Sequence, residues 1–261
     1  MAIIAKYIQK LLQRGQYHFT TNDAMKALNG DSHSVTRALN RLKQKGELAT
    51  PQRGFYVVIP PEYRPLGCLP AEQFVPQLMD RIGEQYHVAL LSAAQLHGAA
   101  HQRPQRFQVM VQKPHKPIEC GTVCVNFFVR SGLARVSTVI MNTPRGHLRV
   151  SSVEATALEL VGYAKHAGGL DNVATILSEL AESIAADKLT KEANHVPLAW
   201  AQRLGYLLEL VGRNDSACEL ERFVRKRARR VTPLNASLPR KGAERSLRWR
   251  VAMNVKVEPD L

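Results

Sequence analysis

Apolar residues in the first 60 positions recur at spacings that predict three short helices. In the stretch 35–42 they fall at i, i+3, i+4 and i+7, which places them along one side of a helix. An earlier stripe begins after Thr20 and Asp23, a pair with the spacing of a capping box. A third stripe covers residues 4–12, and residues 29–31 separate the helix that begins after Thr20 from the helix at 35–42.

The opposite side of the helix at 35–42 is polar, and its side chains are of types that donate hydrogen bonds to base edges or phosphates. Gly46 is expected to end this helix. Residues 48–59 then alternate as two strands around a turn, with Arg53 at its tip. These patterns predict a winged helix-turn-helix, although a merely solvated helix face has the same pattern. The predicted DNA-binding residues are Ser34, Thr36, Arg37, Asn40, Arg41, Lys43, Gln44, Lys45 and Arg53.

The distribution of charge favours the DNA-binding interpretation. Of the formal net charge of +14, residues 1–60 contribute +6 and residues 221–250 contribute +9. Concentrated cations attract a polyanion because each phosphate contact releases counterions. The second cluster predicts a contact with flanking DNA or with an RNA, but cations at a helix C-terminus are also favoured by its dipole. This cluster comprises Arg222, Arg225, Lys226, Arg227, Arg229 and Arg230, and basic residues continue to Arg250.

A domain boundary is predicted at Pro60-Pro61, which divides the 261 residues into a DNA-binding domain at 1–60 and a larger domain at 61–261. In the larger domain the pattern predicts a small sheet covered by helices, so the fold class is α+β. Helices are expected at 70–83, 87–97, 155–163, 173–184, 198–210 and 218–230, and strands at 107–111, 122–129 and 136–141.

No residue pattern supports catalysis or a cofactor. The sequence lacks a phosphate-binding loop, a serine nucleophile elbow and a paired-aspartate magnesium motif. Glu154 and Glu159 are expected to be acids on a helix surface near its N-terminus. We therefore predict that the protein is not an enzyme and binds no cofactor.

A metal site is also not expected. His97 and His101 have the spacing of two ligands on a helix, but Gly98 interrupts it, so these histidines are expected to bond the backbone or face a partner. Cys120 and Cys124 are predicted to share one face of one strand, and no second ligand pair has zinc-site spacing.

The chain is expected to be cytoplasmic and to make no membrane contact. No apolar run approaches the roughly 20 residues of a membrane span, and the N-terminus does not have the order of a signal peptide. The four cysteines do not form a disulfide framework.

Three segments resemble the AbiEi family of bacterial antitoxins. They are residues 53–56, residues 91–102 and residues 151–157, and residues 254–261 have a similar character. The resemblance implies an N-terminal module that represses its own promoter at inverted repeats. It also implies a C-terminal domain that neutralises a nucleotidyltransferase-like toxin, AbiEii, without requiring a stable complex.

Inverted repeats require two copies of the protein on operator DNA, and the free protein is expected to be a monomer or a weak dimer. The alternative from another class is a protein-interaction adaptor whose winged helix docks on an acidic protein. A nuclease or RNA-modifying enzyme would require a cluster of acids that the sequence lacks.

Overall fold

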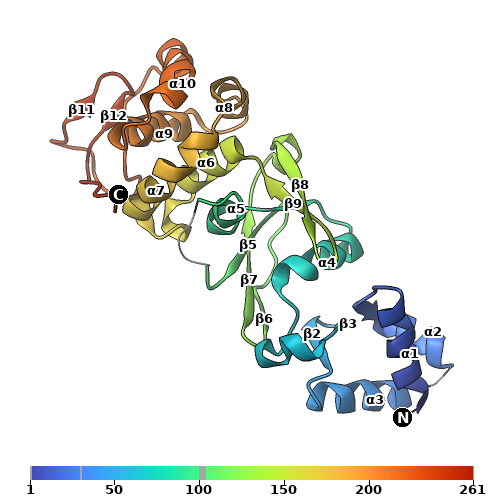
Figure 1. The fold of residues 1–261 in the computed structure, drawn as a ribbon. Coiled ribbons are helices and arrows are strands. Elements are labelled where there is room, and N and C mark those ends of the chain that lie inside the picture. Colours follow the sequence, from blue (N-terminus) through green and yellow to red (C-terminus); the bar gives the residue numbers. More distant parts are fainter. Residues whose placement is uncertain (1, 30, 100–103, 261) are drawn as a thin grey trace. The chain divides into compact units, whose positions relative to one another are not determined.

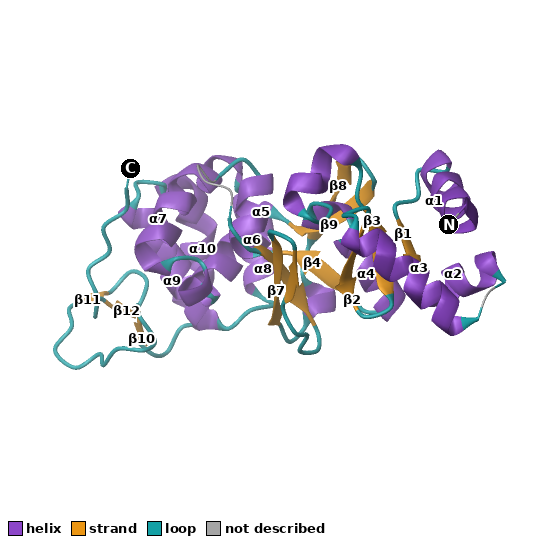
Figure 2. Cartoon of the chain, turned by 90° about the horizontal axis from the view of Figure 1, so that it is seen from below, coloured by secondary structure: helices purple, strands orange, loops and turns teal. Residues whose placement is uncertain are grey.

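The computed structural model describes residues 2–29, 31–99 and 104–260. The chain forms two compact units and passes between them several times. The first unit contains residues 1–86, 105–129 and 140–149, and the second contains residues 87–104, 130–139 and 150–261. Helices and strands occur throughout, which confirms the mixed α+β class (Figure 2).

The first unit begins with three helices and a three-stranded antiparallel sheet. The strand order in this sheet is β1-β3-β2, and β1 pairs with β3 from His18 opposite Val57 to Thr20 opposite Phe55. The elements are α1 (Ala2–Gln13), β1 (His18–Thr20), α2 (Thr21–Leu28), α3 (Ser32–Gln44), β2 (Leu48–Gln52) and β3 (Phe55–Val58).

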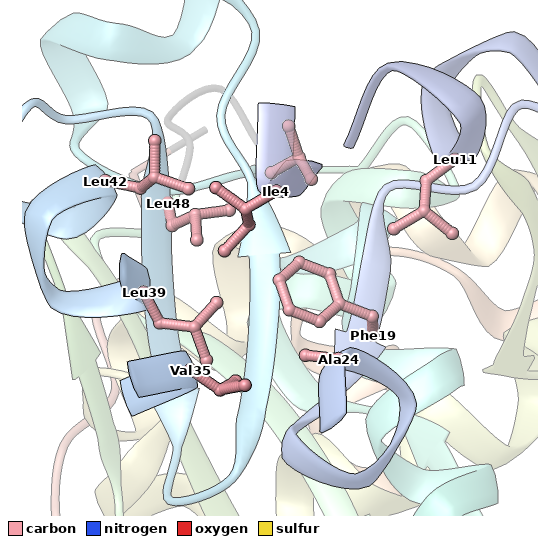
Figure 3. Packing of buried hydrophobic residues seen from close by; sticks show 9 residues of the cluster. Ile4, Leu11, Phe19, Ala24, Val35, Leu39, Leu42 and Leu48 are labelled. Atoms are coloured by element: carbon pink, nitrogen blue, oxygen red, sulfur yellow. The ribbon is translucent and has the colours of Figure 1, made fainter. Parts of the chain in front are cut away.

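A single apolar core holds these six elements together (Figure 3). Phe19 is fully buried at its centre, where its ring meets the edge of Tyr7 and stacks on Tyr56 with ring centroids 5.5 and 5.4 Å away. Each helix contributes apolar side chains to this core. The labelled members are Ile4, Leu11, Phe19, Ala24, Val35, Leu39, Leu42 and Leu48. The predicted periodicity of the three helices is therefore confirmed.

Local hydrogen bonds define where α2 and α3 begin and end. Thr20 and Asp23 form the predicted capping box, with the Asp23 N–H donating to the Thr20 hydroxyl. Asn29 follows α2 in the left-handed conformation, at φ 44°. After α3 the chain turns at Gly46, whose φ of 68° favours glycine.

The rest of the first unit contains a short helix and three paired strands. β7 lies between β6, which is antiparallel to it, and β5, which is parallel to it. Between β6 and β7, a Cβ at Gly121 would lie only 2.0 Å from the Leu66 carbonyl oxygen, so this approach requires glycine. The elements are the 3-10 turns at Pro61–Leu66 and Ala71–Gln73, α4 (Val75–Ile82), β5 (Phe107–Val111), β6 (Ile118–Cys120) and β7 (Val123–Val129).

The second unit is mainly helical, and α6 lies among its other helices (Figure 1). Every residue of α6 from Glu154 to Val161 is buried. The helices are α5 (Leu90–Leu96), α6 (Val153–Gly162), α7 (Gly169–Leu180), α8 (Ala186–Ala193), α9 (Leu198–Leu210) and α10 (Asn214–Arg227). Short 3-10 turns lie at Leu133–Arg135, Ala164–His166 and Ala181–Ser183. A small sheet in the order β10-β12-β11 follows, from Thr232–Pro233, Val251–Ala252 and Arg245–Ser246.

Three further strands have residues in both units. β4 (Tyr86–Val88) is parallel to β9 (Gly146–Ser151), with Val88 opposite Val150. β8 (Thr138–Thr143) is the next strand beyond β9. None of the described helices is long and apolar enough to span a bilayer.

Several predicted boundaries were wrong. The helix expected at 70–83 is a 3-10 turn followed by α4, because Pro76 lacks an amide hydrogen and suits only a first turn. The helix expected at 87–97 begins at Leu90, because Tyr86–Val88 forms a strand; a short apolar run does not distinguish the two. The pattern of the sequence did not predict β1, β6, β9, the short strands β10 to β12 or α8, whereas α9 was predicted to the residue.

Close packing of α9 on a tryptophan generates a stability prediction. A Cβ at Gly205 would lie 2.1 Å from the ring of the fully buried Trp249. We expect Gly205→Ala to lower the free energy of unfolding by about 1–3 kcal/mol, because the ring must move. Urea unfolding followed by tryptophan emission measures this. Alanine in an open helix would instead gain about 1 kcal/mol, so a stabilised variant would contradict the packing.

Candidate nucleic-acid interface

Helix α3 is fixed at its start by Asp31. The Ser34 N–H donates to the Asp31 carboxylate at 2.9 Å. This hydrogen bond lowers the pKa of Asp31 below its ordinary value. A carboxylate at this end of a helix also interacts favourably with the helix dipole.

The core-facing and outward residues of α3 separate as predicted. Val35, Leu39 and Leu42 are buried. The side chains of Arg37 and Asn40 point away from this core and are exposed. All of the predicted DNA-binding residues are exposed to solvent: Ser34, Thr36, Arg37, Asn40, Arg41, Lys43, Gln44, Lys45 and Arg53. Their access to nucleotides is therefore not blocked by the rest of their own unit.

The cations on α3 have no acid within ion-pair distance among the described residues. By contrast, several arginines elsewhere in the chain are paired. Arg248 lies 3.0 Å from Glu209 and 2.7 Å from Glu221, and these carboxylates raise its pKa. These cations thus have no direct ion pair in the described part of the chain, and the Asp31 carboxylate interacts with Arg37 only at longer range.

Arg53 lies at the tip of a tight turn, as predicted, but the hairpin projects little. Thr20, the last residue of β1, already pairs with Phe55, the first residue of β3. The Thr21 N–H donates to the Gly54 carbonyl at 3.2 Å, which ties the turn to the start of α2. Arg53 therefore stays close to the helices.

A cavity of about 680 Å³ opens between α1 and one side of α3. This volume is within the range of ligand pockets. Arg37 and Arg41 line it from α3, Lys45 lines it from the end of that helix, and Ile4 lines it from α1. The three cations were predicted from the sequence. Ile4, Ala5 and Glu47, which also line the cavity, were not predicted as site residues, because only tertiary packing brings α1 and the residue after Gly46 to α3.

The second predicted cluster lies at the end of α10. Arg222, Arg225, Lys226 and Arg227 occupy its last two turns, and Arg229 and Arg230 follow Ala228. All six are exposed, and none forms an ion pair with a described acid. Arg227 lies 4.3 Å from the centre of the Phe223 ring. Arg250 is used differently, since its guanidinium donates to the Ala228 carbonyl at 2.6 Å.

Residues 87–210 match the family model described as the AbiEi antitoxin C-terminal domain. The chain therefore contains an AbiEi antitoxin C-terminal domain. A solved structure, that of the RV2827C protein from Mycobacterium tuberculosis, has a similar fold, with a TM-score of 0.67 over 96% of this chain and 91% of that one. The two sequences are 17% identical, so this likeness concerns the fold alone. No curated protein matches the chain.

Within the AbiEi domain, the expectation of surface acids at Glu154 and Glu159 was wrong. Glu154 is 4% exposed and accepts a hydrogen bond from the Ala185 N–H at 3.1 Å. Glu159 is fully buried, with His87 at 2.8 Å and the Arg130 guanidinium against the same carboxylate oxygen. The carboxylates are neutralised or hydrogen-bonded inside the unit, which is how buried acids are tolerated.

The cysteine prediction was also wrong. Cys120 ends β6 and Cys124 lies in β7, with Cys120 opposite Val123 and Cys124 opposite Glu119, so a hairpin separates them. Cys120 instead accepts a hydrogen bond from the Cys68 thiol; this lowers the pKa of Cys120 and raises that of Cys68.

His97 and His115 have structural partners. Nε2 of His97 lies 2.7 Å from the Ser151 carbonyl oxygen, as expected for a backbone bond, and Gly98 turns at φ 81°. His115 bonds Glu84 at 2.8 Å. His101 lies outside the described residues.

The buried carboxylate of Glu159 generates a second prediction. Replacing Glu159 by Ala leaves Arg130 buried without its partner, and we expect a loss of about 3–5 kcal/mol in the free energy of unfolding. Denaturant unfolding measures it. The control is Glu182→Ala, which breaks an exposed pair with Arg213 at 2.7 Å and should cost under about 1 kcal/mol. Equal losses in the two variants would show that the buried pair contributes no more to the free energy of unfolding than the exposed pair does.

Proposed function

We propose that this AbiEi protein is an antitoxin that also represses its own promoter. In this proposal residues 1–60 are a winged helix-turn-helix domain that binds duplex DNA at inverted repeats, and residues 61–261 neutralise a nucleotidyltransferase-like toxin. The observation that carries the DNA-binding half is α3, whose outward side is exposed and cationic, with no acid partner among the described residues.

The order of elements in the first unit supports this assignment. Two helices, α2 and α3, follow one another across a short turn, and a hairpin follows the second helix. The strand before α2 joins that hairpin in a sheet of order β1-β3-β2. In the helix-turn-helix arrangement the second helix enters the major groove, and this is the position of α3.

The antitoxin half is supported by the family of residues 87–210. In the proposal the toxin is neutralised in the cytoplasm, and a stable complex with it is not required. Two copies of the protein occupy one operator, because the two halves of an inverted repeat present the same sequence to each copy.

The two activities separate in one experiment. Arg37, Asn40 and Arg41 are replaced together by alanine, which removes side chains that contact bases or phosphates at about 1–3 kcal/mol each for a base contact. We expect the shift of a duplex from the protein's own upstream region to weaken at least about 100-fold, and promoter repression to be lost. Rescue of cells that express the toxin should remain.

The control for this variant replaces Lys116, Lys165 and Lys188, three exposed cations outside both basic clusters, and should leave the shift unchanged. If the α3 variant still shifts its upstream duplex as the native protein does, α3 does not bind DNA. That result would favour the alternative in which the winged helix docks on an acidic protein. If rescue disappears while the fold persists, the N-terminal domain contributes to neutralisation.

The basic cluster of α10 gives a further prediction within the same proposal. We propose that it forms a second contact with the polyanion. Replacing Arg225, Arg227, Arg229 and Arg230 by glutamine should reduce the slope of log K against log salt for operator binding by up to about 0.9 for each lost phosphate contact. A titration of the upstream duplex over a salt series measures the slope. An unchanged slope would show that this cluster makes no contact with the phosphates of the operator.

A further inference from the structure

The cavity between α1 and α3 has two chemically different sides. Ile4 and Ala5 contribute apolar atoms from α1. Arg37, Arg41 and Lys45 contribute three positive charges from α3 and its end, and none of them forms an ion pair with a described acid. A ligand that fits this surface carries negative charge at regular intervals and apolar groups between the charges.

The three cations form one row, with Arg37 and Arg41 on α3 and Lys45 as the residue that caps its end. They are four residues apart, and each step of four residues advances about 6 Å along a helix and turns it by only about 40°. The row is therefore about 12 Å long on one side of the helix. Phosphates of one DNA strand follow each other at about 3.4 Å along the duplex axis, so a row of this length passes several of them.

The other outward residues of α3 lie on a different side. Thr36 and Asn40 each precede a member of the row by one residue, which rotates them by about 100° around the helix. Both are exposed, and neither lines the cavity. Asparagine pairs with adenine through two hydrogen bonds in the major groove, a contact that discriminates between bases.

We propose that this cavity receives the sugar-phosphate backbone of one strand of duplex DNA. Arg37, Arg41 and Lys45 bind its phosphates, and Ala5, which is exposed, contacts its sugars. Base recognition then belongs to the side of α3 that carries Thr36 and Asn40. This inference rests on the proposed DNA-binding function and divides its residues into two roles.

Glu47 supplies an internal check on the inference. It lines the same cavity, directly after the turn that ends α3. A carboxylate beside a bound phosphate opposes binding because like charges repel. Removing its charge should therefore strengthen binding, whereas an empty or unused cavity would leave binding unchanged.

The test compares single variants on the upstream duplex and on a random duplex of equal length, each over a salt series. Arg41→Gln and Lys45→Gln should weaken binding to both duplexes by the same factor and reduce each salt slope by about 1. Glu47→Gln should strengthen binding to both duplexes. Asn40→Ala should weaken binding to the upstream duplex alone. Lys10→Gln, at an exposed cation of α1 outside the cavity, should change neither slope.

The outcomes separate this inference from the function on which it rests. A native protein that shifts neither duplex overturns the proposed DNA-binding function and this inference with it. Native binding with an Arg41→Gln loss confined to the upstream duplex shows that Arg41 reads a base, which overturns the inference alone. The inference alone is likewise overturned if Glu47→Gln leaves binding unchanged, or if Lys10→Gln lowers the slope as much as Arg41→Gln. Circular dichroism of each variant confirms that it is folded.

Discussion

The burial of Val35, Leu39 and Leu42 around Phe19 is the constraint on which the proposed interface depends. A 13-residue helix is marginal in water by itself, so α3 is held by the core it shares with α1, α2 and the small sheet. Because these apolar positions fix the rotation of the helix, the cations between them can only point outward. In the proposed function, the core thus determines which side chains face the DNA.

Local signals in the sequence predicted this part of the fold well, and long-range contacts explain the failures. The capping box at Thr20 and the turn at Gly46 each depend on a few neighbouring residues, as does the period of α3. The cavity beside α3 was not predictable, because Ile4 and Glu47 reach it only through tertiary packing. Cys120 was misplaced for a related reason: hairpin turns reset the face on which a side chain lies.

The acids of α6 show where sequence reasoning has the least information. Glu159 in a helix is most often on the surface, and nothing near it in the sequence announces Arg130 or His87. Burying these charges costs several kcal/mol per ion unless geometry and hydrogen bonds compensate. Their contacts with one carboxylate oxygen tie β4 and α6 to the residue that follows β7, all within the second unit. Such a network requires specific partners, so it favours one packing of the helices over others.

Charge pairing divides the basic residues of the chain into two classes. Arg130 and Arg248 have carboxylates that the fold supplies, and their positive charge is compensated. Arg37, Arg41 and Lys45 repeat at four-residue spacing with no such partner among the described residues, and like charges at this spacing destabilise a helix by a few tenths of a kcal/mol per pair. The fold bears this cost in the free protein. In the proposed complex, the phosphates of DNA along the row would attract these cations and offset the repulsion between them.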